Sequence, residues 1–172
     1  MRLYRYVGPK RIADRAGAAP AGAPIRGAED VVAWARASGQ ELVAGCVTAT
    51  FVIDAAGELL IADRRSEHVV CAGRGPVRSA GEMTFSLTEG VEVVEVSNQS
   101  VGYCPEPESW PAVAEALSRA GLRGPNGFAL ACAFRRCEAC GSMNLVKGGV
   151  FECGECEAEL PPAYNVQAFD VG

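Results

Sequence analysis

Two Cys-x-x-Cys pairs near the end of the chain constrain its fold more than any other feature. Cys137 and Cys140 form the first pair, and Cys153 and Cys156 form the second, with twelve residues between the pairs. Four thiolates at this spacing can close a tetrahedral site around one metal ion. The sequence therefore predicts one structural Zn²⁺ with these four cysteines as its ligands, and an iron site with the same ligands is the alternative.

The segment between the two pairs predicts the local fold. Residues 144–146 and 150–152 are expected to form two short paired strands, joined by a turn that contains two glycines. Backbone freedom is expected at Gly141 after the first pair and at Gly154 within the second. Residues 137–160 thus resemble a four-cysteine zinc ribbon of the rubredoxin-like kind. The resemblance implies a structural metal, because four protein ligands leave no open position for water or substrate.

The cellular location is predicted from what the sequence lacks. No stretch approaches the roughly 18 apolar residues of a membrane-spanning helix, and the first residues lack the apolar core of a signal peptide. We therefore expect a cytoplasmic protein without a membrane partner. Because cytoplasmic thiols stay reduced, disulfides between the paired cysteines are disfavoured. A composition rich in Ala, Gly and Arg, with only two lysines, is typical of a GC-rich bacterial genome.

Apolar periodicity outside the ribbon predicts an α+β fold, a mainly antiparallel sheet with two or three helices and a C-terminal zinc ribbon. The adjacent pair Val93 and Val94 interrupts an alternating run and predicts a β-bulge. Residues 16–28 are rich in Gly, Pro and Ala and predict a loop. We expect strands at 3–7, 47–53, 58–62, 82–87, 91–96 and 128–134, and helices between Glu29 and Gly39 and between Ser109 and Gly121.

The same patterns suggest how the chain is divided. We expect an α+β domain at 1–134, a zinc ribbon at 135–160 and a tail at 161–172. Since the strand expected at 128–134 runs directly into the first cysteine pair, the ribbon should be docked on the sheet and not tethered by a linker.

Polar side chains gather between the apolar strands of the central segment and form a candidate catalytic pocket. His68 is the only imidazole and could act as a general base beside a carboxylate. Cys104 could be a nucleophile that His68 activates. Each of these side chains also has an ordinary structural interpretation, as a buried apolar or turn-stabilising residue. The candidates, for hydrolysis or group transfer, are His68, Glu82, Asn98, Ser100, Tyr103 and Cys104.

The central segment carries a second resemblance. Gly81-Glu82 is followed by a strand, a turn, a second strand and the run Ser97-Asn98-Gln99-Ser100-Val101-Gly102-Tyr103-Cys104-Pro105. Residues 50–120 resemble the central domain of plant IQ-motif calmodulin-binding proteins, in which Ala-Gly precedes a strand and Ser-Gly-His-Tyr-x-Pro follows. Here Val101-Gly102 stands where Gly-His is expected, and the chain has no IQ motif. The resemblance implies a shared α+β fold without a transferable activity.

The charge distribution bears on the partner. The chain has a net charge of −5, and residues 41–130 hold six basic and twelve acidic side chains, whereas residues 1–40 hold seven basic and three acidic ones. Arg135, Arg136 and Lys147 could join the N-terminal arginines in a basic stripe for nucleic acid, but the acidic balance disfavours this. The favoured interpretation is a protein-binding or adaptor module. An enzyme is the first alternative, and a nucleic-acid-binding protein is the second.

Overall fold

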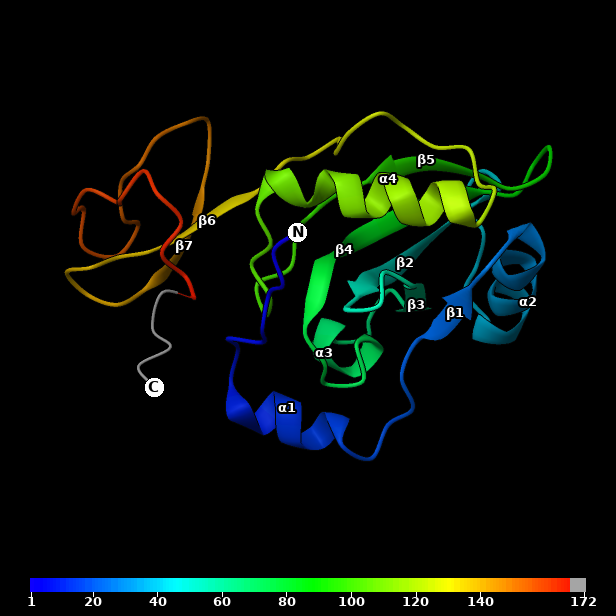
Figure 1. Ribbon diagram of the computed structural model, residues 1–172, viewed down its shortest axis with the longest axis horizontal. Helices are drawn as coiled ribbons and strands as arrows, with labels where there is room; N and C mark the ends of the chain where they lie inside the picture. The colour runs from blue at the N-terminus through cyan, green and yellow to red at the C-terminus, as the bar shows by residue number, and fades with distance from the viewer. Residues whose placement is uncertain (168–172) are drawn as a thin grey trace.

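A five-stranded antiparallel sheet forms the body of the protein, and a two-stranded sheet extends from one end of it (Figure 1). The coordinates are a computed structural model, which describes residues 1–167. The α+β class is confirmed, with four α-helices among these residues where two or three were expected. The large sheet has the order β1-β3-β2-β4-β5, formed by Ala23–Ile25, Leu59–Asp63, Cys46–Asp54, Val77–Ser86 and Glu92–Val96.

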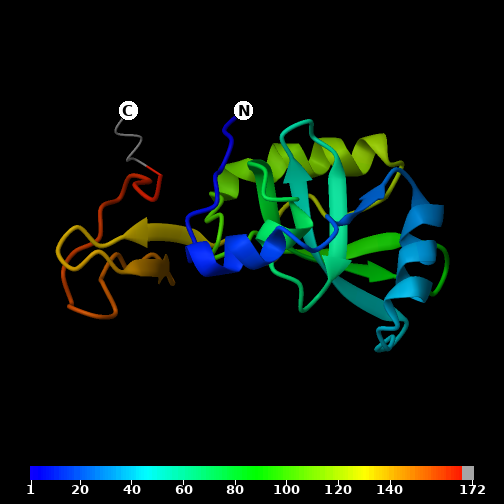
Figure 2. The same cartoon turned by 90° about the horizontal axis from the view of Figure 1, so that it is seen from below.

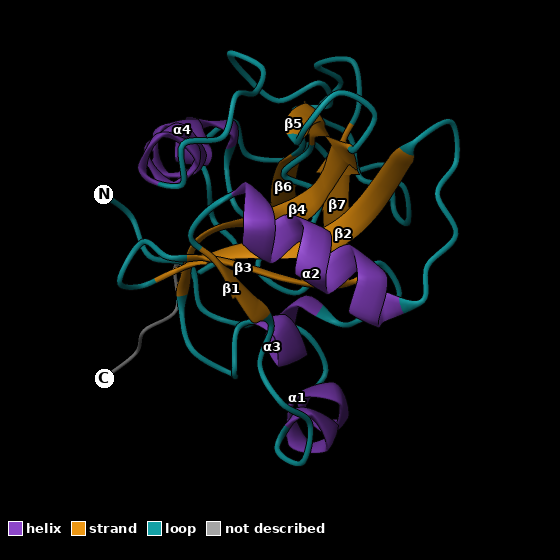
Figure 3. Ribbon diagram, turned by 90° about the vertical axis from the view of Figure 1, so that its right-hand side faces the viewer, coloured by secondary structure: helices purple, strands orange, loops and turns teal. Residues whose placement is uncertain are grey.

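Alternating side chains along β2 divide the core into two layers. Phe51 faces the side of the sheet that is covered by α2 (Ala28–Ser38) and α4 (Trp110–Arg119). Val52 faces the other side and packs against α3 (His68–Cys71). Both side chains are fully buried. The period of two in the sequence therefore gives this central strand two apolar faces, each covered by helices. Figure 3 shows α2 in front of the sheet, with α1 and α3 below it.

The N-terminal region differs from its sequence-based prediction. The strand expected at 3–7 is reduced to one bridge, in which Tyr4 and Val77 exchange backbone hydrogen bonds of 2.7 and 2.9 Å. Helix α1 (Lys10–Ala16) follows Pro9 directly. The loop expected at 16–28 contains β1, an edge strand with a proline at its centre. An edge strand can hold proline because one side of its backbone needs no partner in the sheet. A Pro-rich segment can therefore form such a strand although its composition predicts a loop.

The predicted β-bulge is confirmed at the junction of β4 and β5. Phe85 pairs with Val93 and Thr84 pairs with Glu95, so Val94 is the extra residue. The segment after α4 covers the open edge of β5, where the N–H of Val93 donates to the carbonyl of Arg123 at 2.9 Å. This edge is therefore closed by a loop and not by a further strand.

The strand expected at 128–134 is wrong for most of its length. Ala129 donates its N–H to the carbonyl of Val96 at 2.9 Å, but regular pairing begins only with β6 (Ala133–Arg136). Leu130 is 53% exposed, so the apolar alternation that suggested a buried strand does not reflect burial. The first hairpin of the ribbon begins at Ala133, two residues before the expected domain boundary.

The pairing expected within the ribbon is also wrong. β7 (Met143–Val146) pairs with β6, and of the expected pairing only the turn forms, closed by an isolated bridge between Lys147 and Val150. The first cysteine pair lies in the turn at 137–142 between these two strands, and two backbone hydrogen bonds close this turn, from Cys137 to the Ser142 carbonyl and from Gly141 to the Cys137 carbonyl. Figure 2 shows this small sheet at one end of the molecule.

The expected tail at 161–172 packs against the body over its first part. Val166 is buried, and Tyr164 meets Tyr4 in an edge-to-face contact with ring centroids 6.1 Å apart. Residues 168–172 of that prediction lie outside the described residues. None of the described helices has both the length and the apolar character needed to cross a membrane.

Candidate metal centre

The four cysteines lie in two turns with the same backbone geometry. In each turn the N–H of the first cysteine donates to the carbonyl five residues later, and the N–H four residues later donates back to the cysteine carbonyl. These distances are 2.8 and 2.9 Å at Cys137, and again 2.8 and 2.9 Å at Cys153. The two turns are therefore matched knuckles, and each directs two sulfur atoms toward the other knuckle.

The sulfur positions fit a tetrahedral metal site. All four Sγ atoms lie within 4.8 Å of one another, and the Cys137–Cys156 and Cys140–Cys153 pairs are each 3.6 Å apart. A disulfide would need about 2.05 Å between sulfurs. Four sulfurs placed about 2.3 Å from a central zinc ion would be about 3.8 Å apart, close to the spacing seen here. The sequence prediction that these cysteines form one cluster that can bind a metal is confirmed.

Asn144 connects the two knuckles from the second strand of the ribbon. Its Oδ1 accepts the N–H of Gly154 at 3.0 Å, and its Nδ2 donates to the Ser142 carbonyl at 3.0 Å. The same Nδ2 lies 3.5 Å from the Sγ of Cys153. Groups that hold metal ligands in this way fix their orientation and adjust their basicity. No sequence signal indicates Asn144, because its role depends on the register of β6 and β7.

The thiol groups do not ionise alike in the absence of a cation. The N–H of Glu155 directed at the Cys153 sulfur lowers the pKa of that thiol to about 6. The N–H of Ala158 lowers the pKa of Cys156, but the neighbouring thiols of Cys140 and Cys137 outweigh it and raise that pKa to about 12. A bound divalent cation would compensate the charge of four thiolates, so metal binding here would release protons.

In each knuckle, the residue that follows the second cysteine adopts the left-handed conformation. Gly141 has a φ of 78°, and the corresponding residue of the second knuckle, Glu157, has a φ of 60°. Gly154, where backbone freedom was expected, is not among the positive-φ glycines. A residue with a Cβ costs about 1–2 kcal/mol in this conformation. The second knuckle therefore carries strain that the first avoids.

A buried ion pair joins the ribbon to the body. Arg135 of β6 donates from a terminal guanidinium nitrogen to Oε1 of Glu106 at 2.8 Å, and the two side chains are only 7% and 11% exposed. The guanidinium also donates to the carbonyl of Pro162, from Nε at 3.2 Å and from the second terminal nitrogen at 2.9 Å. Arg135 thus holds together β6, the body and the segment after the ribbon. From the sequence, Arg135 was expected only as a nucleic-acid contact, and no local signal indicates Glu106 as its partner.

Asn98 and Tyr103, two of the candidate catalytic residues, are buried and bonded to backbone. Asn98 donates to the carbonyls of Pro105 and Cys132, both at 2.8 Å, and accepts the N–H of Cys132 at 2.6 Å. Tyr103 donates its hydroxyl to the Gly75 carbonyl at 2.8 Å, and burial raises its pKa. Both side chains therefore stabilise the loop at 97–105.

The next two candidates, His68 and Glu82, lie beside the start of that loop, where Ser97 donates its N–H to the Glu82 carbonyl at 2.9 Å. His68 donates its Nε2–H to the Gly81 carbonyl at 3.0 Å, and burial lowers the pKa of the ring. Glu82 faces a surface hollow of about 520 Å³ and pairs with Arg64 at 3.2 Å. Of the predicted catalytic set, only Glu82 lines that hollow. A catalytic role for His68 and Glu82 stays a prediction.

The last two candidates, Cys104 and Ser100, belong to the 97–105 loop and are buried. Cys104 donates its thiol to the Val101 carbonyl at 3.1 Å, and burial raises the pKa of that thiol to about 12. A nucleophilic cysteine needs the opposite shift. The hydroxyl of Ser100 is buried, with no hydrogen-bond partner among the residues that the structure describes.

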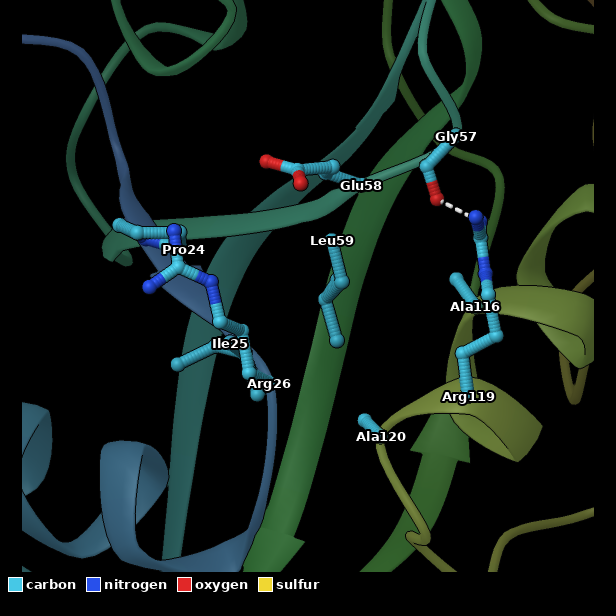
Figure 4. Close-up of a pocket in the computed structure, with 9 residues that line it drawn as sticks. All are labelled: Pro24, Ile25, Arg26, Gly57, Glu58, Leu59, Ala116, Arg119 and Ala120. Atoms are coloured by element: carbon cyan, nitrogen blue, oxygen red, sulfur yellow. Dashed lines mark hydrogen bonds between the residues drawn. The ribbon is translucent and has the colours of Figure 1, made fainter.

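A small cavity lies between β1, the β2–β3 turn and α4 (Figure 4). Arg119 reaches from α4 to donate to the Gly57 carbonyl at its edge, and Ile25 and Leu59 provide apolar walls. Its volume is about 130 Å³. Sites for small molecules usually enclose about 300–1,000 Å³, so this cavity is smaller than a typical small-molecule site.

Comparisons with known proteins add no relative to this geometry. No protein-family model, no curated protein and no solved structure matches the chain. The resemblance of residues 50–120 to plant IQ-motif proteins stays a prediction, and the four-cysteine cluster rests on its own geometry.

Proposed function

We propose that the four cysteines bind one Zn²⁺ and that this ion is structural. The donor set fits zinc, because four-cysteine tetrahedral sites are typical of structural zinc, and zinc has no redox chemistry of its own. Four protein ligands complete the coordination of the ion, so no position remains to activate water. The ion would instead fix the two knuckles to each other.

We further propose that the protein is a protein-binding module of the bacterial cytoplasm. The observation that carries this proposal is the closed cluster of four sulfur atoms on a lobe that Arg135 and Glu106 anchor to the body. A ribbon held rigidly on the body would offer a partner protein a surface of fixed shape. The enzyme alternative is weaker, because Asn98, Tyr103 and Cys104 already use their polar atoms in backbone hydrogen bonds.

Cobalt substitution tests the closed site directly. The full chain, stripped of metal and reloaded with Co²⁺ under reducing conditions, should give the intense absorption of a tetrahedral four-thiolate complex. Added imidazole should leave the spectrum unchanged, because no coordination position is open. A spectrum that shifts on addition of imidazole would show an exchangeable position and contradict a purely structural ion. As a matched control, Cys46→Ser alters a cysteine outside the cluster and should leave the cobalt spectrum intact.

A further inference from the structure

A groove with an unusual charge lies where the two ends of the described chain meet. It has a volume of about 730 Å³ and lies between the N-terminal segment, the segment after the ribbon and the end of β6. Figure 2 shows the N-terminal segment and the C-terminal part of the chain on the same side of the molecule. Its lining includes Arg2, Arg5, Tyr6, Arg136, Tyr164 and Gln167.

The lining is basic, although the protein is acidic overall. Arg2 and Arg136 bring positive charge to the groove, and none of its described lining residues carries a carboxylate. Arg5 has an interaction partner of its own and is not counted toward this charge. The whole chain has a net charge of −5. The guanidinium of Arg2 lies over the ring of Tyr164, 4.9 Å from its centroid, which orders this arginine without neutralising it. The groove therefore concentrates positive charge beside aromatic surface.

The walls of the groove are held by specific contacts. Gln167 accepts the backbone N–H of Arg5 at 3.0 Å and donates to the Arg5 carbonyl at 2.9 Å. Tyr6 packs edge-to-face on the buried ring of Tyr103, with centroids 5.7 Å apart. These contacts hold the two chain segments side by side. Binding to such an ordered surface loses little conformational entropy.

Arg136 links the groove to the metal centre. It immediately precedes Cys137, and one of its guanidinium nitrogens donates to the Gly141 carbonyl within the first knuckle at 3.1 Å. Its backbone N–H donates to Asn165 at 2.8 Å. The position of this arginine therefore depends on the knuckle that holds two of the four sulfur atoms.

We propose that this groove binds an extended acidic segment of a partner protein. Arginines bind carboxylates through paired, charge-assisted hydrogen bonds, and Tyr and Arg, together with Trp, are enriched at the energetic centres of protein interfaces. A nucleic acid fits less well, because phosphate backbones need a broader positive surface than Arg2 and Arg136 on an acidic protein provide. The inference rests on the proposed protein-binding function and names the chemistry of the partner.

The test is a selection of short random peptides on the immobilised, zinc-loaded full chain. We expect the enriched peptides to be rich in Asp and Glu. They should bind about tenfold or more weakly to the Arg2→Glu/Arg136→Glu variant, since charge reversal replaces attraction with repulsion. Arg36→Glu, an exposed charge change on α2 at the far end of the body, is the matched control and should bind as the unmodified chain does. The single variant Arg2→Glu, remote from the knuckle, covers the case in which the double variant loses metal.

The outcomes separate this proposal from the proposed metal role. Enriched peptides without acidic residues, or binding unchanged in Arg2→Glu, would overturn the groove proposal while a full zinc content left the structural ion standing. Tighter binding of an oligothymidylate than of the selected peptides would also overturn it, in favour of nucleic acid. Loss of zinc from the unmodified chain with acidic-peptide binding retained would instead refute the structural role of the ion.

Discussion

The ion pair between Glu106 and Arg135 gives the sharpest test of how the ribbon is held on the body. Glu106→Gln keeps the shape of the side chain and removes its charge, which leaves the guanidinium of a 7%-exposed arginine without its counter-ion. Breaking a buried pair in this way typically costs about 3–5 kcal/mol. We expect the lower end, about 3 kcal/mol, because the Phe134 and Pro162 carbonyls still accept from the guanidinium.

The assay is thermal unfolding followed by circular dichroism in the zinc-loaded protein. For a chain of this length, about 3 kcal/mol should lower the midpoint by about 6–12 °C. Glu108→Gln is the matched control, because Glu108 is exposed and lies two residues away, in the short helix that begins directly after Glu106; its midpoint should hardly change. In the double variant Glu106→Gln/Arg135→Met the buried charge is gone, so stability should partly return. Equal midpoints for Glu106→Gln and Glu108→Gln would refute the reasoning.

Three further predictions follow from single side chains. Gly141→Ala should destabilise the protein by about 1–2 kcal/mol in thermal unfolding because of its left-handed conformation, whereas Glu157→Gly should not destabilise it; equal losses would contradict the matched-knuckle geometry. Asn98→Ala removes three buried hydrogen bonds and should cost about 3 kcal/mol or more in the same assay, and a loss under about 1 kcal/mol would mean that these bonds contribute little. Burial lowers the pKa of His68 below its usual 6.5, so the unfolded chain binds a proton more readily. Folded stability should therefore fall as pH drops below about 6.5, and this part of the fall should be absent in His68→Gln, which keeps a donor for Gly81; identical pH profiles would refute it.

Residue type and spacing over a few neighbouring residues predict β2 and the β-bulge of β5. The β-branched run at 47–53 forms β2, and the adjacent valines form the bulge at Val94 because an extra residue must leave the alternation. Short helices such as α1 and α3 carry too few residues for a periodic pattern. The partner of β7 depends on which turn closes more readily, and propensity over four residues does not decide that.

The candidate metal centre and the groove likewise contain some residues that local sequence predicts and others that it does not. The cysteine spacing is a local signal, and it predicts the four ligands correctly as one cluster. Asn144, Glu106 and the groove arginines each meet partners from other parts of the chain, so only the folded structure reveals their roles. The candidate catalytic residues show the reverse: a polar run such as Ser97–Pro105 has the same composition whether its side chains face a ligand or bond to backbone. Asn98 and Tyr103 bond to backbone.

The most direct test of the account is elemental analysis of the full chain, purified under reducing conditions without added metal. The account predicts about one zinc ion per chain, retained through dialysis, because four thiolates close the site. It predicts that Cys140→Ser loses most of the zinc and unfolds its ribbon at a lower temperature, since metal binding and folding are coupled. A folded chain that contains no zinc, or a Cys140→Ser variant with unchanged zinc content and thermal stability, would contradict the central claim.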